Sequence, residues 1–375
     1  MQRRNFVKVM AGTGGLVAVG GGSLVASCLA ETTQPEIVPG AGGMLLHRAR
    51  VVSPLDLTLT ARRATAEIAP GVTSPIYTWD DGPIGSTIEA RRGDRARILL
   101  RNEIDQPTIA HWHGLRPPQE ADGHPRLAIP PGAEYRYDFT IDERAGLYWY
   151  HPHPHMRTAN QTYFGLVGLL IVRDEVEDAL GLPSGDREIC AAFQDKRRDG
   201  SGRLVYTGRG PSMMEGFLGD ETFANGVQGA VIEVESALHR VRILNGSNAR
   251  IYRVALSNGA PLTLIGSDGG LLPAPIEVPY LDMGTGERAD LLIDFSGLRE
   301  GETVSLRSLE FPSPVHGGMG MGMMRGGMAG GLRQGSAVPM LDFVVRREVR
   351  ERPRVPAALP SIPRLSRADA DRQRV

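Results

Sequence analysis

The sequence is poor in cysteine, in net charge and in long apolar runs. Its 375 residues contain two cysteines, which excludes a scaffold held together by disulfides. The formal net charge of −1 gives no basis for a nucleic-acid partner or an anionic membrane surface. Many turns between short strands are favoured over long helices, because the chain has 47 glycines and 27 prolines. The length is sufficient for two or three domains.

The N-terminus, residues 1–30, is predicted to be an export signal. Residues 3–8, RRNFVK, resemble the signature read by the twin-arginine export machinery, which carries folded proteins. The apolar stretch that follows is interrupted by glycines and would make a poor membrane-spanning helix. An ordinary secretory signal with chance arginines is the alternative. The mature protein is therefore expected in the periplasm or cell envelope.

The sequence is compatible with two ways of processing the signal segment. Residues 25–28, VASC, resemble a lipobox, in which case Cys28 would become a lipidated N-terminus. The alternative is cleavage near Ala30 and release of a soluble protein. Residues 31–43 are expected to form a flexible lead-in.

The region 44–175 is predicted to be a β domain. Several short segments alternate apolar and polar residues with period two, or are apolar throughout, and turn residues separate them. Such spacing is typical of a sandwich or barrel. The expected strands are 55–60, 95–100, 135–141, 147–150 and 165–172.

Two short windows of this region each carry a His-x-His pair, His111 with His113 and His151 with His153. Side chains at i and i+2 of a strand point to the same face. Two such pairs on neighbouring strands would aim four imidazoles into one space. Neutral imidazole suits copper, zinc, iron and nickel, so the pattern predicts a metal site. For either pair alone, exposed or hydrogen-bonded histidines are the competing interpretation.

Four other histidines, and the tryptophans near the pairs, are not predicted to bind metal. His155 continues the same-face pattern and is expected beside the site or in solvent, and His124 lies in a polar loop. No partner in the sequence accompanies His47 or His239. The tryptophans beside the pairs, which are expected to pack around the site, are Trp112 and Trp149.

These windows belong to an ordered set of motifs that resembles the first cupredoxin domain of the multicopper oxidases. The set comprises Gly93-Asp94, His111-Trp112-His113-Gly114, Asp122-Gly123, residues 129–132 (IPPG) and residues 146–153 (GLYWYHPH). The resemblance implies that His111 binds a type 2 copper, His113 and His151 one type 3 copper, and His153 the other. In the family this cluster reduces dioxygen to water with electrons from a small reductant such as Cu(I) or a phenol.

The region 183–347 is also predicted to be a β domain. It resembles the middle domain of three-domain multicopper oxidases, which binds no copper in that family. Its expected strands include 240–246, 251–256, 262–270, 286–295 and 340–345, whereas 231–234 alternates poorly. The expected fold is therefore all-β, with two tandem cupredoxin-like Greek-key β-sandwich domains. Cys190 is interpreted as a packing residue. The structural turn charges are expected to be Glu287, Arg288 and Asp290.

A methionine-rich insert, residues 313–333, interrupts the end of this second region. Thioether sulfur is soft and suits Cu(I), so the insert is a candidate for transient Cu(I) capture. The alternative is a low-complexity loop with incidental methionines. The residues concerned are His316, Met319, Met321, Met323, Met324 and Met328.

The segment 348–375 is expected to be a linker toward an absent third domain, with nothing to pack against. In the family that domain carries a His-Cys-His motif and the type 1 copper, and this sequence has no matching motif. The chain is therefore expected to be a truncated multicopper oxidase that is inactive alone. Two alternatives are an exported copper-buffering protein without catalysis and an envelope scaffold that has lost copper.

Overall fold

The structure is a computed structural model that describes residues 44–45, 51–52, 55–80, 82–207, 216–312, 332–350 and 354–362. The predicted signal 1–30 with Cys28, the lead-in 31–43, and the run of His316 and the five methionines lie outside the described residues. Among the described residues, no helix has the length and apolar character needed to cross a membrane.

Strands between residues 51 and 173 form two sheets that pack face to face. The five-stranded sheet has the order β2 (Val51–Val52), β5 (Thr87–Arg91), β10 (Gly168–Arg173), β9 (Gly146–Pro152) and β7 (Ala110–His113). The four-stranded sheet has the order β4 (Val72–Thr78), β3 (Asp56–Ala69), β6 (Arg95–Asn102) and β8 (Glu134–Thr140). Their facing side chains form one core, which includes Leu59, Ile98, Trp112, Tyr150 and Leu170.

Strands between residues 188 and 347, joined by β1 (Met44–Leu45), form a second and larger sandwich. One sheet has the order β13 (Val227–Gln228), β12 (Glu221–Ala224), β11 (Glu188–Lys196), β15 (Leu238–Asn245), β20 (Arg288–Asp294), β17 (Leu262–Ser267) and β18 (Gly270–Val278). The other has the order β1, β14 (Ala230–Glu235), β22 (Val338–Arg347), β21 (Thr303–Ser308), β16 (Tyr252–Leu256) and β19 (Leu281–Met283). The prediction of an all-β fold with two sandwiches is confirmed.

The described helices are short. They are α1 (Thr158–Phe164), α2 (Glu175–Asp178) and the 3-10 turns η1 (Pro125–Leu127) and η2 (Gly185–Arg187). Helix α1 was not expected, and it shortens the predicted strand 165–172. Gly165 ends α1 with φ +125°, and β10 begins only at Gly168. Residues 231–234, whose alternation is poor, nevertheless form β14, because both neighbours of that strand pair with it.

The domain limits 44–175 and 183–347 remain a prediction, and one strand crosses between the halves. β1 pairs in parallel with β14 of the second sandwich, whereas β2 pairs in parallel with β5 of the first. The segment at the beginning of the predicted first domain is therefore hydrogen-bonded to both sandwiches.

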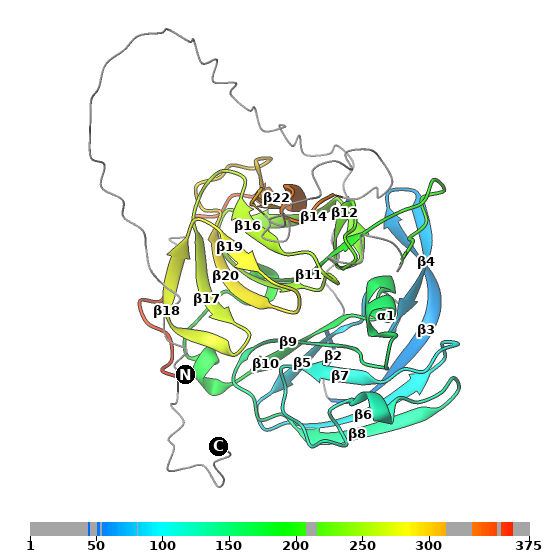
Figure 1. The fold of residues 1–375 in the computed structure, drawn as a ribbon. Coiled ribbons are helices and arrows are strands. Elements are labelled where there is room, and N and C mark those ends of the chain that lie inside the picture. The colour runs from blue at the N-terminus through cyan, green and yellow to red at the C-terminus, as the bar shows by residue number, and fades with distance from the viewer. Residues whose placement is uncertain are drawn as a thin grey trace, which may run out of the picture. The chain divides into compact units, whose positions relative to one another are not determined.

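Strand β9 is buried on both of its faces and joins the two sandwiches (Figure 1). Its even residues, Tyr148 and Tyr150, enter the core of the first sandwich. Its odd residues, Leu147 and Trp149, form a separate cluster with residues of β10, β11 and β15. This interface cluster consists of Ile84, Leu147, Trp149, Val167, Leu169, Ile171, Ala192 and Leu244.

A buried ionic network crosses the same interface. Arg242 of β15, which is fully buried, donates to Glu177 of α2 at 2.7 Å and to Glu188 of β11 at 2.6 Å. Arg240 pairs with Asp290 at 2.6 Å, and Arg173 completes the network through Glu188. Three guanidinium groups thus neutralise three carboxylates, so that charges removed from water retain partners.

Leu359, in the described part of the tail at 354–362, does pack, which corrects the expectation that the tail has nothing to pack against. Leu359 is 8% exposed and lies in a cluster with Leu238, Ile265, Leu271 and Leu292. Its backbone N–H donates to Pro273 O of β18 at 3.0 Å. This contact could not be predicted from the sequence, because prolines recur every three or four residues there and such a segment has no periodic apolar face.

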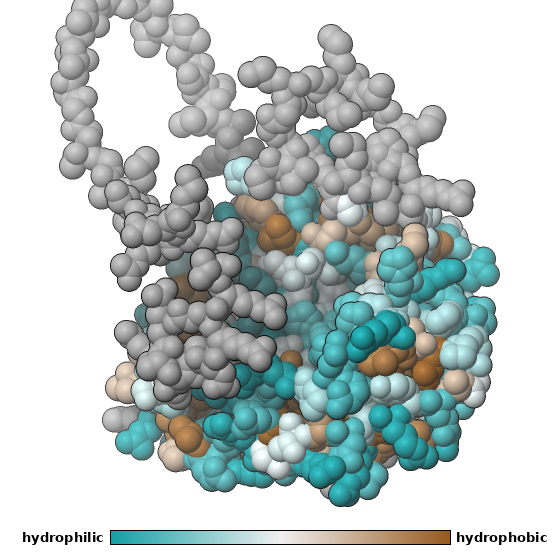
Figure 2. Space-filling view, turned by 60° about the horizontal axis from the view of Figure 1, so that its bottom comes forward, coloured by the Kyte–Doolittle hydropathy of each residue, from teal (hydrophilic) through white to brown (hydrophobic). Residues whose placement is uncertain are grey.

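The described surface is mostly hydrophilic in the view of Figure 2, where apolar residues occur in small separate groups. Single exposed apolar residues are ordinary on a protein surface and do not by themselves indicate a binding face.

Helix α1, which follows the second histidine pair, is held at its C-terminal end by β11. Gln194 donates to Thr162 O at 3.0 Å, and the Lys196 ammonium donates to Tyr163 O. Lys196 also lies over the rings of Tyr163 and Phe223. The second sandwich therefore fixes the chain just beyond the histidines.

Replacing Arg242 with methionine should lower the free energy of unfolding by about 3–5 kcal/mol, because it leaves three buried carboxylates with only two guanidinium groups. Urea denaturation monitored by tryptophan fluorescence measures this change. Arg95→Met, which removes an exposed partner of Asp138, is the control and should have little effect. Equal midpoints for the two variants would contradict the assigned role of the network.

Lys196 should make stability depend on pH in the alkaline range. Burial lowers the pKa of Lys196 from 10.5 to about 7, and Asp195 offsets this only in part. Between these values the unfolded chain binds more protons than the folded chain, so Lys196 makes stability rise with pH, by at most about 1.4 kcal/mol per unit. The difference in unfolding free energy between wild type and Lys196→Met, measured from pH 7 to 10, should increase with pH. A constant difference would show that Lys196 does not titrate in this window.

Candidate metal centre

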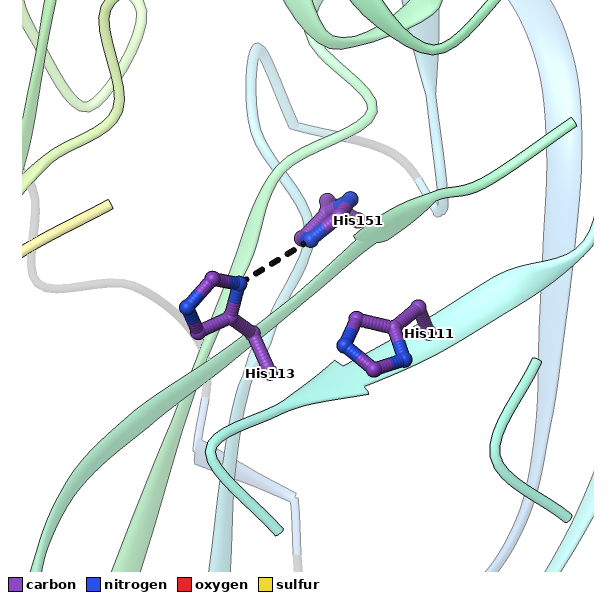
Figure 3. A group of neighbouring side chains, drawn as sticks. All are labelled: His111, His113 and His151. Carbon is purple, nitrogen blue, oxygen red and sulfur yellow. Dashed lines mark hydrogen bonds between the residues drawn. The ribbon is translucent and has the colours of Figure 1, made fainter. Parts of the chain in front are cut away.

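The two histidine windows lie on adjacent antiparallel strands, β7 and β9. The register places His111 directly opposite His151, and His113 opposite Trp149. His153 follows the end of β9 and extends the pairing, since its N–H donates to Ile109 O at 2.9 Å. Figure 3 shows His111, His113 and His151 turned toward a common space.

The alternation of each strand explains why the rings share one face. Trp112 is fully buried in the core of the first sandwich, so its neighbours His111 and His113 must point to the opposite face. On β9, Tyr150 is anchored in the same core by a 2.7 Å hydrogen bond from its hydroxyl to Ser86 O. A Cβ at Gly168 would lie 2.0 Å from the Tyr150 ring, so glycine is needed there to admit the tyrosine.

Two of the histidines have one ring nitrogen engaged by a backbone carbonyl. His111 Nδ1 lies 2.6 Å from Asp122 O, and His151 Nδ1 lies 2.9 Å from Pro152 O. A carbonyl accepts only, so each Nδ1 must be the protonated nitrogen. Each Nε2 then keeps its lone pair, which is the arrangement found in metal-binding histidines.

One ring nitrogen each of His111, His113 and His151 lie within 4.8 Å of one another. His113 Nδ1 and His151 Nε2 are 3.2 Å apart, the pair joined by the dashed line in Figure 3. Two nitrogens that share a metal, each about 2.0 Å from it, lie roughly 3 Å apart, so this spacing fits a common ion.

Burial keeps two of these imidazoles neutral. Burial is the main cause that lowers the pKa of His151 to about 3; the hydrogen bond to Pro152 O opposes this shift, and the neighbouring histidines add to it. Burial also lowers the pKa of His113 to about 4, with Arg288 and His111 adding to the effect. Both rings therefore have lone pairs available at neutral pH, as a metal ligand requires.

His153 lies beside this group, and one of its ring nitrogens has no partner among the described residues. Its ring centre lies 5.3 Å from that of His111 and 6.0 Å from that of His151. Its Nδ1 is buried without a hydrogen-bond partner among the described residues. Because a buried polar atom is costly to leave unpaired, this nitrogen is suited to contact a metal ion or a water molecule.

Trp149 packs against the site, as expected, whereas Trp112 packs in the core of the first sandwich, on the opposite face of β7. The ring centre of Trp149 lies 4.3 Å from that of His151 and 4.8 Å from that of His113, in tilted arrangements. The indole thus fixes the orientation of one histidine from each strand. Stacking of this kind could be anticipated from the register once His113 was paired with Trp149.

The second sandwich also reaches the site, which the sequence interpretation missed. The turn 284–287 between β19 and β20 passes beside His113, and a Cβ at Gly286 would lie 3.5 Å from His113 Cε1. Arg288, interpreted as a structural turn charge, donates across the interface to Leu147 O at 3.2 Å. The Gly-Glu-Arg motif was visible in the sequence, but nothing in it indicated which face of the first sandwich it meets.

The other candidates lie elsewhere. His155 and His124 are exposed, and His124 caps η1 by accepting from Arg126 N. His239 is buried beside Phe295, and His47 lies outside the described residues. Cys190 packs against the interface cluster, where burial raises the pKa of its thiol to about 12 and keeps it protonated.

The chain is similar to several known proteins. The family described as multicopper oxidase matches residues 60–177. The cell division protein FtsP of Escherichia coli (strain K12) is 32% identical over 317 residues, which are 84% of this chain and 64% of that protein. The multicopper oxidase mco of Staphylococcus haemolyticus is 33% identical over 251 residues, 67% of this chain and 55% of that protein. The chain therefore spans less than two thirds of these relatives.

Solved structures show the same relationship. The 2F4 variant of the McoA multicopper oxidase from the hyperthermophile Aquifex aeolicus superposes with a TM-score of 0.76 at 33% identity. The match covers 88% of this chain and 71% of that one. A laccase from Pediococcus acidilactici matches with a TM-score of 0.74 at 30% identity, covering 88% of this chain and 67% of that one.

Gly123 should be essential for the contact between Asp122 and His111. Its φ is +75°, and a Cβ there would lie 2.0 Å from Ala110 O and 2.8 Å from His111 Cα. Gly123→Ala should therefore cost well above the roughly 1–2 kcal/mol of left-handed backbone strain alone. Gly132→Ala, at φ +78° in open space, supplies that strain without the clash. Urea denaturation of both variants tests this, and equal losses of stability would exclude the clash.

Proposed function

Because the chain belongs to the multicopper oxidase family, we propose that His111, His113, His151 and His153 bind copper. The observation that carries this proposal is the convergence of imidazole nitrogens from two adjacent strands, with three of them within 4.8 Å. Imidazole is a good copper ligand. Three features fit a bound metal: the tautomers of His111 and His151, the neutral rings of His113 and His151, and a His153 nitrogen without a partner among the described residues.

The division of ligands follows the family resemblance. His113 and His151 are assigned to one type 3 copper, which their 3.2 Å nitrogen separation supports. His153 is assigned to the second type 3 copper and His111 to the type 2 copper. These four residues would form one part of a trinuclear site, and no type 1 site is assigned among residues 1–375.

In the full-length architecture, the proposed function is oxidation of Cu(I) or phenol-type donors coupled to reduction of dioxygen. Copper would supply the one-electron redox chemistry. The residues of this chain contribute positions: carbonyls of Asp122 and Pro152 set the tautomers of His111 and His151. Trp149 stacks on the rings of His113 and His151 and holds their orientation.

An exported copper-buffering protein without catalysis is the second proposal. The same four histidines support it, since binding requires no electron donor. A scaffold without copper is the third class, and it draws on the similarity to the cell division protein FtsP. The intact histidine set argues against it, because a scaffold has no need of four converging imidazoles.

The N-terminal and methionine-rich segments extend the proposal. Export by the twin-arginine machinery to the periplasm or envelope, with lipidation at Cys28 as one variant, would place the protein where copper is handled. The run of His316, Met319, Met321, Met323, Met324 and Met328 would gather Cu(I).

Copper stoichiometry of the purified chain tests the binding proposal. The wild type should retain copper after dialysis, and a variant with alanine at all four histidines should retain much less. His124→Ala and His155→Ala together form the control and should keep the wild-type copper content, because both histidines are exposed. Equal copper in the wild type and the quadruple variant would favour the scaffold. Oxygen uptake with Cu(I) by the purified chain would exclude a buffering protein and would contradict the expectation that the chain is inactive alone.

A further inference from the structure

We propose that Arg288 of the second sandwich is a positioning residue for His113, so that copper binding depends on docking of the two sandwiches. This inference rests on the proposed copper-binding function of the four histidines. It assigns Arg288 no contact with the metal, and it concerns how the ring of His113 is held.

Arg288 is buried, and its guanidinium donates to backbone carbonyls of three different segments. Its Nε donates to Leu147 O of β9 at 3.2 Å, its Nη1 to Gly286 O at 2.9 Å and its Nη2 to Asp268 O at 2.9 Å. It also pairs with the Asp268 carboxylate at 2.9 Å. A planar guanidinium can join three segments in this way, whereas an ammonium offers a single point.

The guanidinium lies directly against the turn that follows His113. Gly114 has φ +92°, and a Cβ there would lie 2.7 Å from Arg288 Nη2 and 2.9 Å from the Tyr148 ring. Only glycine leaves room for the arginine at this position. The backbone that carries His113 out of β7 therefore rests on Arg288.

Arg288 also holds the turn of the second sandwich that lies beside both His113 and Trp149. Its bond to Gly286 O fixes the turn 284–287, whose Gly286 lies beside His113. Trp149 packs on the ring from the first sandwich, 4.8 Å away. His113 thus packs against Trp149 and against a turn of the second sandwich, and Arg288 holds that turn in place.

Residues that orient metal ligands typically change metal affinity by about 10–100-fold when they are replaced. Arg288→Met should therefore weaken copper binding by about this factor, measured by chelator competition with Cu(I) on the full chain. The electron paramagnetic resonance spectrum of the Cu(II)-loaded protein should change as well. Arg288→Lys should recover only part of the affinity, because the single nitrogen of an ammonium cannot reach three carbonyls that now bond three separate guanidinium nitrogens.

Arg250→Met is the matched control. Arg250 is another buried arginine of the second sandwich, and it binds Asp195 and the carbonyls of Gly219 and Leu332. Its loss should lower stability but leave copper affinity and the Cu(II) spectrum unchanged. An Arg288→Met protein that matches Arg250→Met in both copper readouts would overturn the inference.

Glycine variants test the same contact if Arg288→Met fails to fold. Gly114→Ala places a methyl against Arg288, whereas Gly93→Ala, at φ +94° in open space, adds the same backbone strain elsewhere. Gly114→Ala should weaken copper binding and Gly93→Ala should not, and equal affinities would overturn the inference. Where the Arg288 variants do fold, the effect of Gly114→Ala should shrink in an Arg288→Ala background; an undiminished effect would overturn the role assigned to Arg288.

Failure of the inference is distinguishable from failure of the proposed function. If the wild type and the quadruple-alanine variant bind equal copper, the histidines are not ligands and both proposals fall. If the wild type binds through the histidines while the Arg288 and Gly114 variants match their controls, only the role of Arg288 is refuted.

Discussion

Burial of β9 on both faces is the constraint on which the arrangement of this molecule depends. One face of the strand fills the core of the first sandwich, and the other fills the interface with the second. His151 continues the interface row after Leu147 and Trp149, so its direction follows from the packing of those two residues. A register slip of one residue would exchange the two rows and remove the histidine from the site. Docking of the sandwiches and orientation of the site are therefore set by the same strand.

Much of the first sandwich could be predicted from the sequence, because its signals are local. Period-two alternation located β6 and β8, and His-x-His spacing placed each pair on one face of a strand. That the two pairs lie on adjacent strands required only the assumption of a sandwich, which the register of β7 with β9 bears out. Helix α1 escaped prediction because the side chains that donate to its C-terminal carbonyls, Gln194 and Lys196, come from β11 of the second sandwich.

The parts that could not be predicted are contacts between segments far apart in the chain. Arg288 was interpreted as a turn charge, and its local surroundings support that reading, since it bonds Gly286 and Asp268. Its contact with Leu147 spans 141 residues, and no local pattern encodes it. The packing of Leu359 on β18 is of the same kind. Arginine and proline-flanked leucine have many possible partners, so only the assembled fold selects one.

The two-faced strand also has a consequence for the order in which the chain matures during synthesis. The first sandwich can assemble once β10 has emerged, but the outward side chains of Leu147, Val167, Leu169 and Ile171 then have nothing to cover them. Their cover comes from β11 and β15, and the sheet that completes the second sandwich waits for β22, at residues 338–347. Transiently exposed apolar surface of this kind makes a nascent chain prone to aggregation. The half-made protein would thus depend on rapid completion or on chaperones, although its histidine strands are already paired.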